Sequence, residues 1–138
     1  DTDVYIEITE AVPFSHYENC VSVLRELRSR GRVHLVIDDL GAGFSNLKRI
    51  VDLQPAVVKL DIELVHGIDR VPRQRALVRS IVSMCREQGA HVVAEGIETV
   101  DELTAVIDTG VQYGQGYLLA RPAFPVPPVS WPPGIFKH

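Results

Sequence analysis

The chain has 138 residues, of which 46% are hydrophobic and 23% are charged, and its formal net charge at pH 7 is −4. This composition predicts one ordinary domain, and the acidic balance argues against binding of a nucleic-acid polymer, which needs clustered Lys and Arg. No apolar run approaches the roughly 20 residues of a membrane span and no signal-peptide pattern opens the chain, so we expect a cytoplasmic protein without a membrane segment. Cys20 and Cys85 lack the spacing of metal or redox pairs and predict buried thiols.

The first predicted element is a strand at residues 4–9. A helix follows, which begins at Ser15 and ends at Gly31. Ser15 and Glu18 have the spacing of a capping box, and a glycine is a typical helix stop.

The second strand is expected at residues 34–37, and a glycine loop leads from it to a short helix at residues 46–53. Pro55 ends that helix, because the residue before a proline avoids the helical conformation. A third strand is expected at residues 57–60. Both strands are apolar runs that end on charged residues.

A longer helix is expected at residues 72–89, with a proline as its start signal and a glycine as its stop signal. Its apolar face is predicted to consist of Leu77, Ile81 and either Met84 or Cys85. This helix separates the third strand from the fourth.

The fourth strand is expected at residues 91–94. Thr99 and Glu102 have the spacing of a second capping box, and the helix that they start ends at Gly110. A fifth strand is expected near residues 112–119.

Alternating strand and helix patterns with short connections indicate a parallel α/β sheet, either an open doubly wound sheet or a closed barrel. The barrel is favoured because each predicted strand delivers polar residues at its C-terminal end, where barrel active sites lie. These residues are Glu10, Asp38, Asp39, Lys59, Asp61, Glu95, Glu98 and Gln115. A complete barrel needs about 250 residues and eight strands, so the chain is predicted to be TIM-barrel-like with only about half of the barrel.

Five of these residues are carboxylates that would converge on one rim, namely Glu10, Asp38, Asp39, Asp61 and Glu95. Converging carboxylates resist ionisation unless cations neutralise them, and oxygen ligands favour Mg²⁺ or Mn²⁺. Two such ions can activate a water and stabilise the leaving oxygen of an in-line displacement at phosphorus, which is phosphodiester hydrolysis. Two plainer interpretations stay open: Asp38 and Asp39 could simply cap the following turn, and Glu7 inside the first strand could be structural.

Five sequence motifs resemble those of one bacterial enzyme family. IEITE, DDLGAGFSNL, VVKLD, VAEGIET and YGQGYLLARP occur in the order, and close to the spacing, of the EAL-domain phosphodiesterases that hydrolyse cyclic di-GMP. The resemblance implies the C-terminal half of a modified TIM barrel. We therefore expect a partial EAL domain at residues 1–122 and a proline-rich, extended tail at residues 123–138.

The resemblance also implies roles for the carboxylates. Glu10 and Asp38 would bind a first metal ion, and Asp39 and Asp61 would bind a second, each ion being Mg²⁺ or Mn²⁺. Glu95 would be the general base or a further metal ligand.

The other polar residues receive roles from the same resemblance. Lys59 would orient the attacking water and offset phosphate charge, and Gln115 would hydrogen-bond near that water. Glu98 would brace the loop that follows the aspartate pair, and Gly41 and Gly43 would permit the turn of that loop.

The chain departs from the family pattern in this loop, which reads DDFGTGYSSL in the family. Leu40, Ala42, Phe44 and Asn46 replace family residues here, and in the family the loop couples dimer contacts to metal binding. The glutamate of the E-A-L motif and an asparagine ligand belong to earlier strands, and neither motif occurs in this chain. Two ligands of the first metal ion are therefore missing.

Position 1 is Asp and the only methionine is Met84, which indicates either a removed initiator segment or the C-terminal part of a longer protein. The leading hypothesis is a metal-dependent phosphodiesterase that opens cyclic di-GMP to linear pGpG within a complete EAL domain, as a homodimer or fused to a regulatory domain. The alternative is a non-catalytic module that binds cyclic di-GMP or a protein partner. A lone half barrel would expose two sheet edges and an apolar inner face, which favours assembly with a partner.

Overall fold

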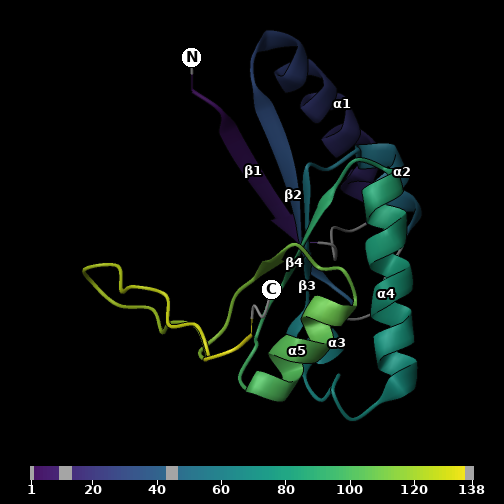
Figure 1. Cartoon of the computed structure of the whole chain (residues 1–138). Coiled ribbons are helices and arrows are strands. Elements are labelled where there is room, and N and C mark those ends of the chain that lie inside the picture. Colours follow the sequence, from purple (N-terminus) through teal and green to yellow (C-terminus); the bar gives the residue numbers. More distant parts are fainter. Residues whose placement is uncertain (1, 10–13, 43–46, 136–138) are drawn as a thin grey trace.

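A computed structural model describes residues 2–9, 14–42 and 47–135 of the chain (Figure 1). Its five strands are parallel and lie in sequential order across one sheet. They are β1 (Val4–Thr9), β2 (Val33–Leu40), β3 (Val57–Leu60), β4 (His91–Ala94) and β5 (Tyr113–Gly114). A sequential order is that of a barrel segment, whereas a doubly wound sheet reverses its order at a switch point. The predicted barrel-like α/β architecture is confirmed.

Five helices are interspersed with these strands in the described part of the chain. They are α1 (Phe14–Arg30), α2 (Lys48–Leu53), α3 (Ile62–Val65), α4 (Pro72–Glu87) and α5 (Val100–Asp108). Figure 1 shows α1, α2 and α4 together on one side of the sheet. Among the described residues, no helix combines the length and the apolar character that a membrane crossing requires.

The core lies between the helices and one face of the sheet. Alternate strand residues on that face are at most 1% exposed, and they include Leu35, Ile37, Val58, Leu60, Val92 and Ala94. Helix α4 buries Val78, Ile81, Val82 and Cys85 against this core. The predicted apolar face of α4 is therefore confirmed for Ile81 and Cys85 but wrong for Leu77, which is 50% exposed because the neighbouring Val78 faces the core.

The opposite face of the sheet carries the remaining strand residues, because successive side chains of a strand point to opposite faces. Tyr5 and Tyr113 lie on the two edge strands and are 60% and 56% exposed. Glu7 and Lys59 share this face and form an ion pair across it. The face that the helices leave free is thus the one that presents charged groups.

The predicted bounds of β1, β3 and β4 are confirmed. Strand β2 extends to Leu40, so both aspartates lie inside the strand and not after it. Strand β5 contains only Tyr113 and Gly114, because the chain then turns and the N–H of Leu118 donates to the carbonyl of Ile97.

One predicted capping box is confirmed and one is wrong. The Thr99 hydroxyl accepts a hydrogen bond from the N–H of Glu102, whose carboxylate accepts one from Thr99 in return. Ser15, in contrast, lies inside α1, which begins at Phe14. The prediction of buried thiols is confirmed for Cys85, whose pKa burial raises to about 11, whereas Cys20 is only half-buried.

The described part of the tail, up to Ile135, forms neither a helix nor a strand. The N–H of Ser130 donates to the carbonyl of Leu119 at 2.8 Å and holds the tail against the body. Phe124 and Val126 are 99% and 89% exposed. Most of the described tail residues are therefore exposed, and the division of the chain at residue 122 stays a prediction.

Candidate functional site

The C-terminal ends of β2, β3 and β4 bring four predicted site residues together. One carboxylate oxygen from each of Asp38, Asp39 and Glu95 lies within 4.8 Å of the others. Lys59 Nζ lies 2.8 Å from Glu95 Oε1 and 3.6 Å from Asp38 Oδ1. The side chains of Lys59 and Glu95 are 18% and 17% exposed, so water screens this cluster only partly.

A bulge in β2 explains how two consecutive aspartates reach the same rim. Regular strand alternation would turn Asp39 toward the helices, opposite to Asp38. Strand β2, however, uses one residue more than β3 between the paired positions Ile37 and Leu40, and Asp39 adopts a left-handed φ of 57°. Leu40 then occupies the buried position, and the extra residue keeps its carboxylate at the rim.

Glu7 belongs to the same cluster, although the sequence left a structural role open for this residue inside β1. Its Oε1 lies 2.9 Å from Lys59 Nζ. In the register of the sheet Glu7 pairs with Val36, two residues before Asp38, so it shares the face of Asp38. A charged residue inside an otherwise apolar strand was the available signal in the sequence.

The ionisation of these groups reflects their crowding. Burial by itself would raise the pKa of Asp38. Hydrogen bonds with the Glu7 side chain and the Asp39 backbone, together with the charge of Lys59, lower this pKa instead. Burial and the charges of Asp38 and Asp61 raise the pKa of Asp39. Burial also raises the pKa of Glu95, in spite of its hydrogen bond with Lys59.

Lys59 is the cation that holds the cluster together. Burial by itself would lower its pKa, but the contacts with Glu95 and Glu7 hold the pKa of Lys59 above its usual range. The ammonium is therefore charged throughout the physiological pH range. It offsets part of the negative charge that Asp38 and Glu95 bring to the rim.

Asp61 and Gln115 lie at the edges of this cluster. The Asp61 side chain accepts a hydrogen bond from the N–H of Glu63 at 3.0 Å and caps α3. It is not one of the three carboxylates within 4.8 Å of one another, but its charge acts on Asp39. Gln115 follows β5, where its N–H donates to the carbonyl of Ala94 at 2.9 Å.

Other predicted residues concern the loops of the rim. Glu10 and Gly43 lie outside the described residues, so their predicted roles stay predictions. Gly41 has a φ of 102°, a backbone conformation that glycine adopts more readily than other residues. The Glu98 side chain is exposed, and its predicted role toward the loop after Asp39 also stays a prediction because part of that loop is not described.

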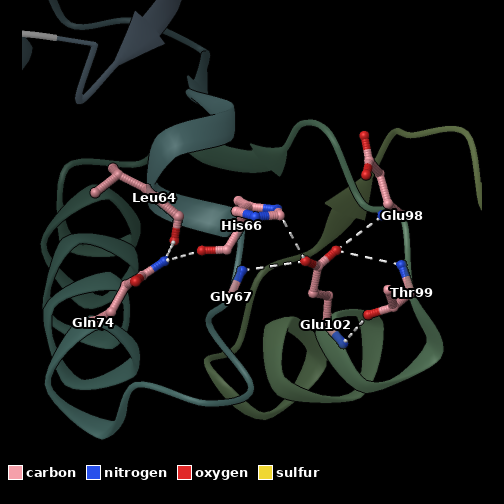
Figure 2. A network of polar contacts seen from close by, with 7 residues as sticks. All are labelled: Leu64, His66, Gly67, Gln74, Glu98, Thr99 and Glu102. Carbon is pink, nitrogen blue, oxygen red and sulfur yellow. Dashed lines mark hydrogen bonds and ion pairs between the residues drawn. The ribbon is translucent and has the colours of Figure 1, made fainter.

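A second polar network is centred on the carboxylate of Glu102 (Figure 2). Glu102 is only 2% exposed and accepts hydrogen bonds from the N–H groups of Gly67, Glu98 and Thr99. His66 Nδ1 lies 3.4 Å from its Oε1. The network ties the loop after β3 to the loop after β4, which carries the predicted site residue Glu98. The sequence indicated Glu102 only as a helix cap.

Replacing Glu102 by Gln is expected to lower the free energy of unfolding by about 1–3 kcal/mol at pH 7, because one amide oxygen cannot replace two charged acceptors. Burial would raise the pKa of Glu102, but the backbone hydrogen bonds and His66 lower it. The stabilisation is therefore present above the ordinary glutamate pKa of about 4.3 and is lost as the pH falls through the lowered value. Urea unfolding of both proteins at pH 7 and at pH 3.5 measures this difference.

Asp101→Asn is the matched control, because Asp101 is an exposed carboxylate in the first turn of the same helix. Its effect should stay within about 0.5 kcal/mol at both pH values. If the difference in unfolding free energy between Glu102→Gln and the unsubstituted protein were as large at pH 3.5 as at pH 7, the assigned charge effect would be contradicted.

A pocket of about 600 Å³ adjoins the carboxylate cluster. Glu95, Glu98 and Gln115 line it from the rim of the sheet. Its other walls include Tyr117, over whose ring the Arg121 guanidinium lies at 4.6 Å, and residues of the tail. Its volume is within the range of about 300–1,000 Å³ that small-molecule sites occupy.

The cluster fits a divalent cation in chemistry and in spacing. Three carboxylate oxygens converge, and two of the carboxyl groups, Asp39 and Glu95, have raised pKa values that a bound cation would reverse. Oxygen-only ligands suit Mg²⁺, Mn²⁺ or Ca²⁺. Among the described residues, these three carboxylates are thus the group that could hold a divalent ion, together with further oxygen ligands.

Comparison with known proteins identifies relatives over most of the chain. The family model of the EAL domain matches residues 1–122. The probable cyclic di-GMP phosphodiesterase PdeA of Escherichia coli (strain K12) is 36% identical over 119 residues, which are 86% of this chain and 16% of PdeA. The cyclic di-GMP phosphodiesterase RocR of Pseudomonas aeruginosa is 36% identical over 125 residues, which are 88% of this chain and 31% of RocR.

Two solved structures share the fold. Klebsiella pneumoniae BlrP1, in a complex with calcium and cyclic di-GMP, has a TM-score of 0.80 and 39% identity over 86% of this chain and 30% of its own. A standalone EAL protein of Vibrio cholerae O395, in its cyclic di-GMP bound form, has a TM-score of 0.82 and 27% identity over 97% of this chain and 56% of its own. The chain thus spans less than two thirds of each of these relatives.

Proposed function

Because this chain belongs to the EAL domain family, we propose that it supplies the C-terminal half of an active site that hydrolyses cyclic di-GMP to linear pGpG. The observation that carries this proposal is the convergence of Asp38, Asp39 and Glu95 around Lys59 at one rim. Relatives named cyclic di-GMP phosphodiesterases, and solved neighbours in complex with cyclic di-GMP and calcium or manganese, support it.

The proposed site uses two divalent ions, Mg²⁺ or Mn²⁺. When bound, the ions would lower the pKa of a water and offset the charge that develops on the phosphate. Asp38 would hold one ion together with Glu10, and Asp39 would hold the other together with Asp61. The bulge in β2 supports this division, because it presents two consecutive carboxylates at one rim.

The remaining side chains would handle the proton and the substrate. Glu95 would accept the proton of the attacking water, and its raised pKa suits a general base better than an ordinary carboxylate. Lys59 would offset phosphate charge while its hydrogen bond orients Glu95. Gln115 lines the adjoining pocket and would hydrogen-bond near the attacking water.

The proposal is tested with the chain joined to the preceding half of an EAL barrel, which supplies the E-A-L glutamate and the asparagine ligand. We expect Mn²⁺-dependent conversion of cyclic di-GMP to pGpG, followed by chromatography. Asp39→Asn should abolish turnover while the barrel stays folded, because asparagine tolerates the left-handed backbone but carries no charge. A folded barrel that leaves cyclic di-GMP intact at saturating Mn²⁺ would refute the proposal.

The second candidate is a non-catalytic module that binds cyclic di-GMP or a protein partner. The exposure of Tyr5 and Tyr113 on the free face of the two edge strands favours it. Such a module would bind cyclic di-GMP equally well in EDTA and in Mn²⁺, whereas the proposed enzyme would need the metal for turnover. Calorimetry in both buffers separates the two functions.

The proposed setting is the bacterial cytoplasm, with a homodimer or a fused regulatory domain as partner. The free cysteines Cys20 and Cys85 suit a reducing compartment. Gel filtration of a complete barrel that contains this chain tests the dimer.

A further inference from the structure

The tail forms one wall of the pocket that adjoins the carboxylate cluster. Val126, Pro127 and Val129 line this wall, while Glu95 and Gln115 line the pocket from the rim of the sheet. The EAL family model ends at residue 122, so this wall lies beyond the matched part of the chain. The pocket therefore joins residues inside the family match to a segment that follows it.

The tail wall is held in place by local contacts. The N–H of Ser130 donates to the carbonyl of Leu119, next to Val129. Pro127 is half-buried, unlike its exposed neighbours in the tail. Prolines restrict the backbone of the segment, which reduces the entropy that the tail would lose when a ligand binds against it.

The two walls of the pocket differ in chemistry. The tail side presents the apolar side chains of Val126, Pro127 and Val129, whereas the rim presents carboxylate and amide groups from Glu98 and Gln115. A nucleobase has apolar faces and hydrogen-bonding edges, so it can satisfy both walls at once. A phosphate has no apolar face to offer to the tail, and a ribose offers less apolar surface than a base.

We propose that Val126, Pro127 and Val129 contact a purine base of the phosphodiester substrate and thereby determine its specificity. This inference rests on the proposed function, because the base enters the pocket next to the carboxylates that would act on the phosphate. It assigns the tail a role in binding and none in the chemical step. The expected consequence is a change in KM or Kd with little change in kcat.

The test compares two tail variants in the protein that carries this chain. Val126→Ser/Val129→Ser replaces two of the three apolar side chains of the wall, and Phe124→Ser is the matched control because Phe124 is 99% exposed and does not line the pocket. We expect the double variant to raise the Kd for cyclic di-GMP about five- to tenfold in calorimetry with Ca²⁺. Phe124→Ser should bind like the unsubstituted protein, and all three proteins should have the same melting temperature.

Hydrolysis with Mn²⁺ is measured separately, so that the two proposals can fail independently. Weaker binding by the double variant supports the tail wall even if no protein hydrolyses cyclic di-GMP, a result that would refute only the proposed function. Unchanged binding by the double variant overturns the tail wall even if hydrolysis proceeds. Tighter binding would also overturn it, because the tail would then obstruct the pocket. Absence of cyclic di-GMP binding by the unsubstituted protein overturns it as well.

Discussion

Replacing Lys59 by Met in a complete barrel that contains this chain is expected to reduce kcat for cyclic di-GMP by at least about 100-fold. The ammonium lies 2.9 Å from Glu7, 2.8 Å from Glu95 and 3.6 Å from Asp38, and methionine keeps the side-chain length while it removes the charge. Without the cation, three carboxyl groups face one another and the phosphate loses a positive neighbour. Steady-state kinetics with saturating Mn²⁺ measures the loss.

Metal affinity separates this role from that of a metal ligand. Lys59→Met should bind Mn²⁺ at least as tightly as the unsubstituted protein, because an ammonium repels a cation, whereas Asp38→Asn should bind it more weakly. Lys48→Met is the matched control, since Lys48 is an exposed lysine of α2 that pairs with Asp52. A Lys59→Met protein that keeps kcat within about tenfold would contradict the assigned role.

Replacing Gly116 by Ala is expected to lower the free energy of unfolding by about 3 kcal/mol or more. A Cβ at this position would overlap the backbone N and O atoms of Ile97 and would lie 2.7 Å from its carbonyl carbon. Backbone cannot rotate away as a flexible side chain can, so the segment after β5 must move away from the segment after β4. That movement would also separate Gln115 from Glu95. Urea unfolding measures the stability change.

Gly31→Ala is the control for this substitution. A Cβ at Gly31 meets nothing within 4 Å, and Gly31 is not among the glycines with positive φ. Gly31→Ala should change the free energy of unfolding by no more than about 0.5 kcal/mol. A small increase in stability is also consistent with this control, because alanine lowers the conformational entropy of the unfolded chain. A Gly116→Ala protein as stable as Gly31→Ala would mean that the two segments are not packed as closely as described.

The elements that the sequence predicted well are those in which local chemistry agrees with packing. β3 and β4 are short, mostly apolar runs that are each followed by an acidic residue, and their bounds are confirmed. The box of Thr99 and Glu102 is confirmed because both of its hydrogen bonds are local. β5 was overestimated, because the apolar residues after Gln115 pack as turns against Ile97 and not as a strand.

Other features depend on contacts between distant parts of the chain. Leu77 and Val78 are adjacent and both apolar, and the packing of α4 on the sheet buries Val78 together with Ile81. Glu102 becomes a link between two loops only because Gly67 lies next to it in the fold. The ion pair of Glu7 joins it to Lys59, which is 52 residues away along the chain, so the sequence alone left a structural role for Glu7 open.

The sequence by itself determined that this chain is an α/β protein whose strands end on carboxylates, because hydrophobic periodicity and strand-end charge are local properties. It also carried enough of the EAL motifs to indicate the family. Only the tertiary structure decided which carboxylates meet. A single extra residue in β2 turns Asp39 to the rim beside Asp38 and Glu95, while Asp61 caps a helix at the edge of the cluster. The physical reason is that the direction of a side chain depends on strand register, and register is set by the pairing of β2 with β3.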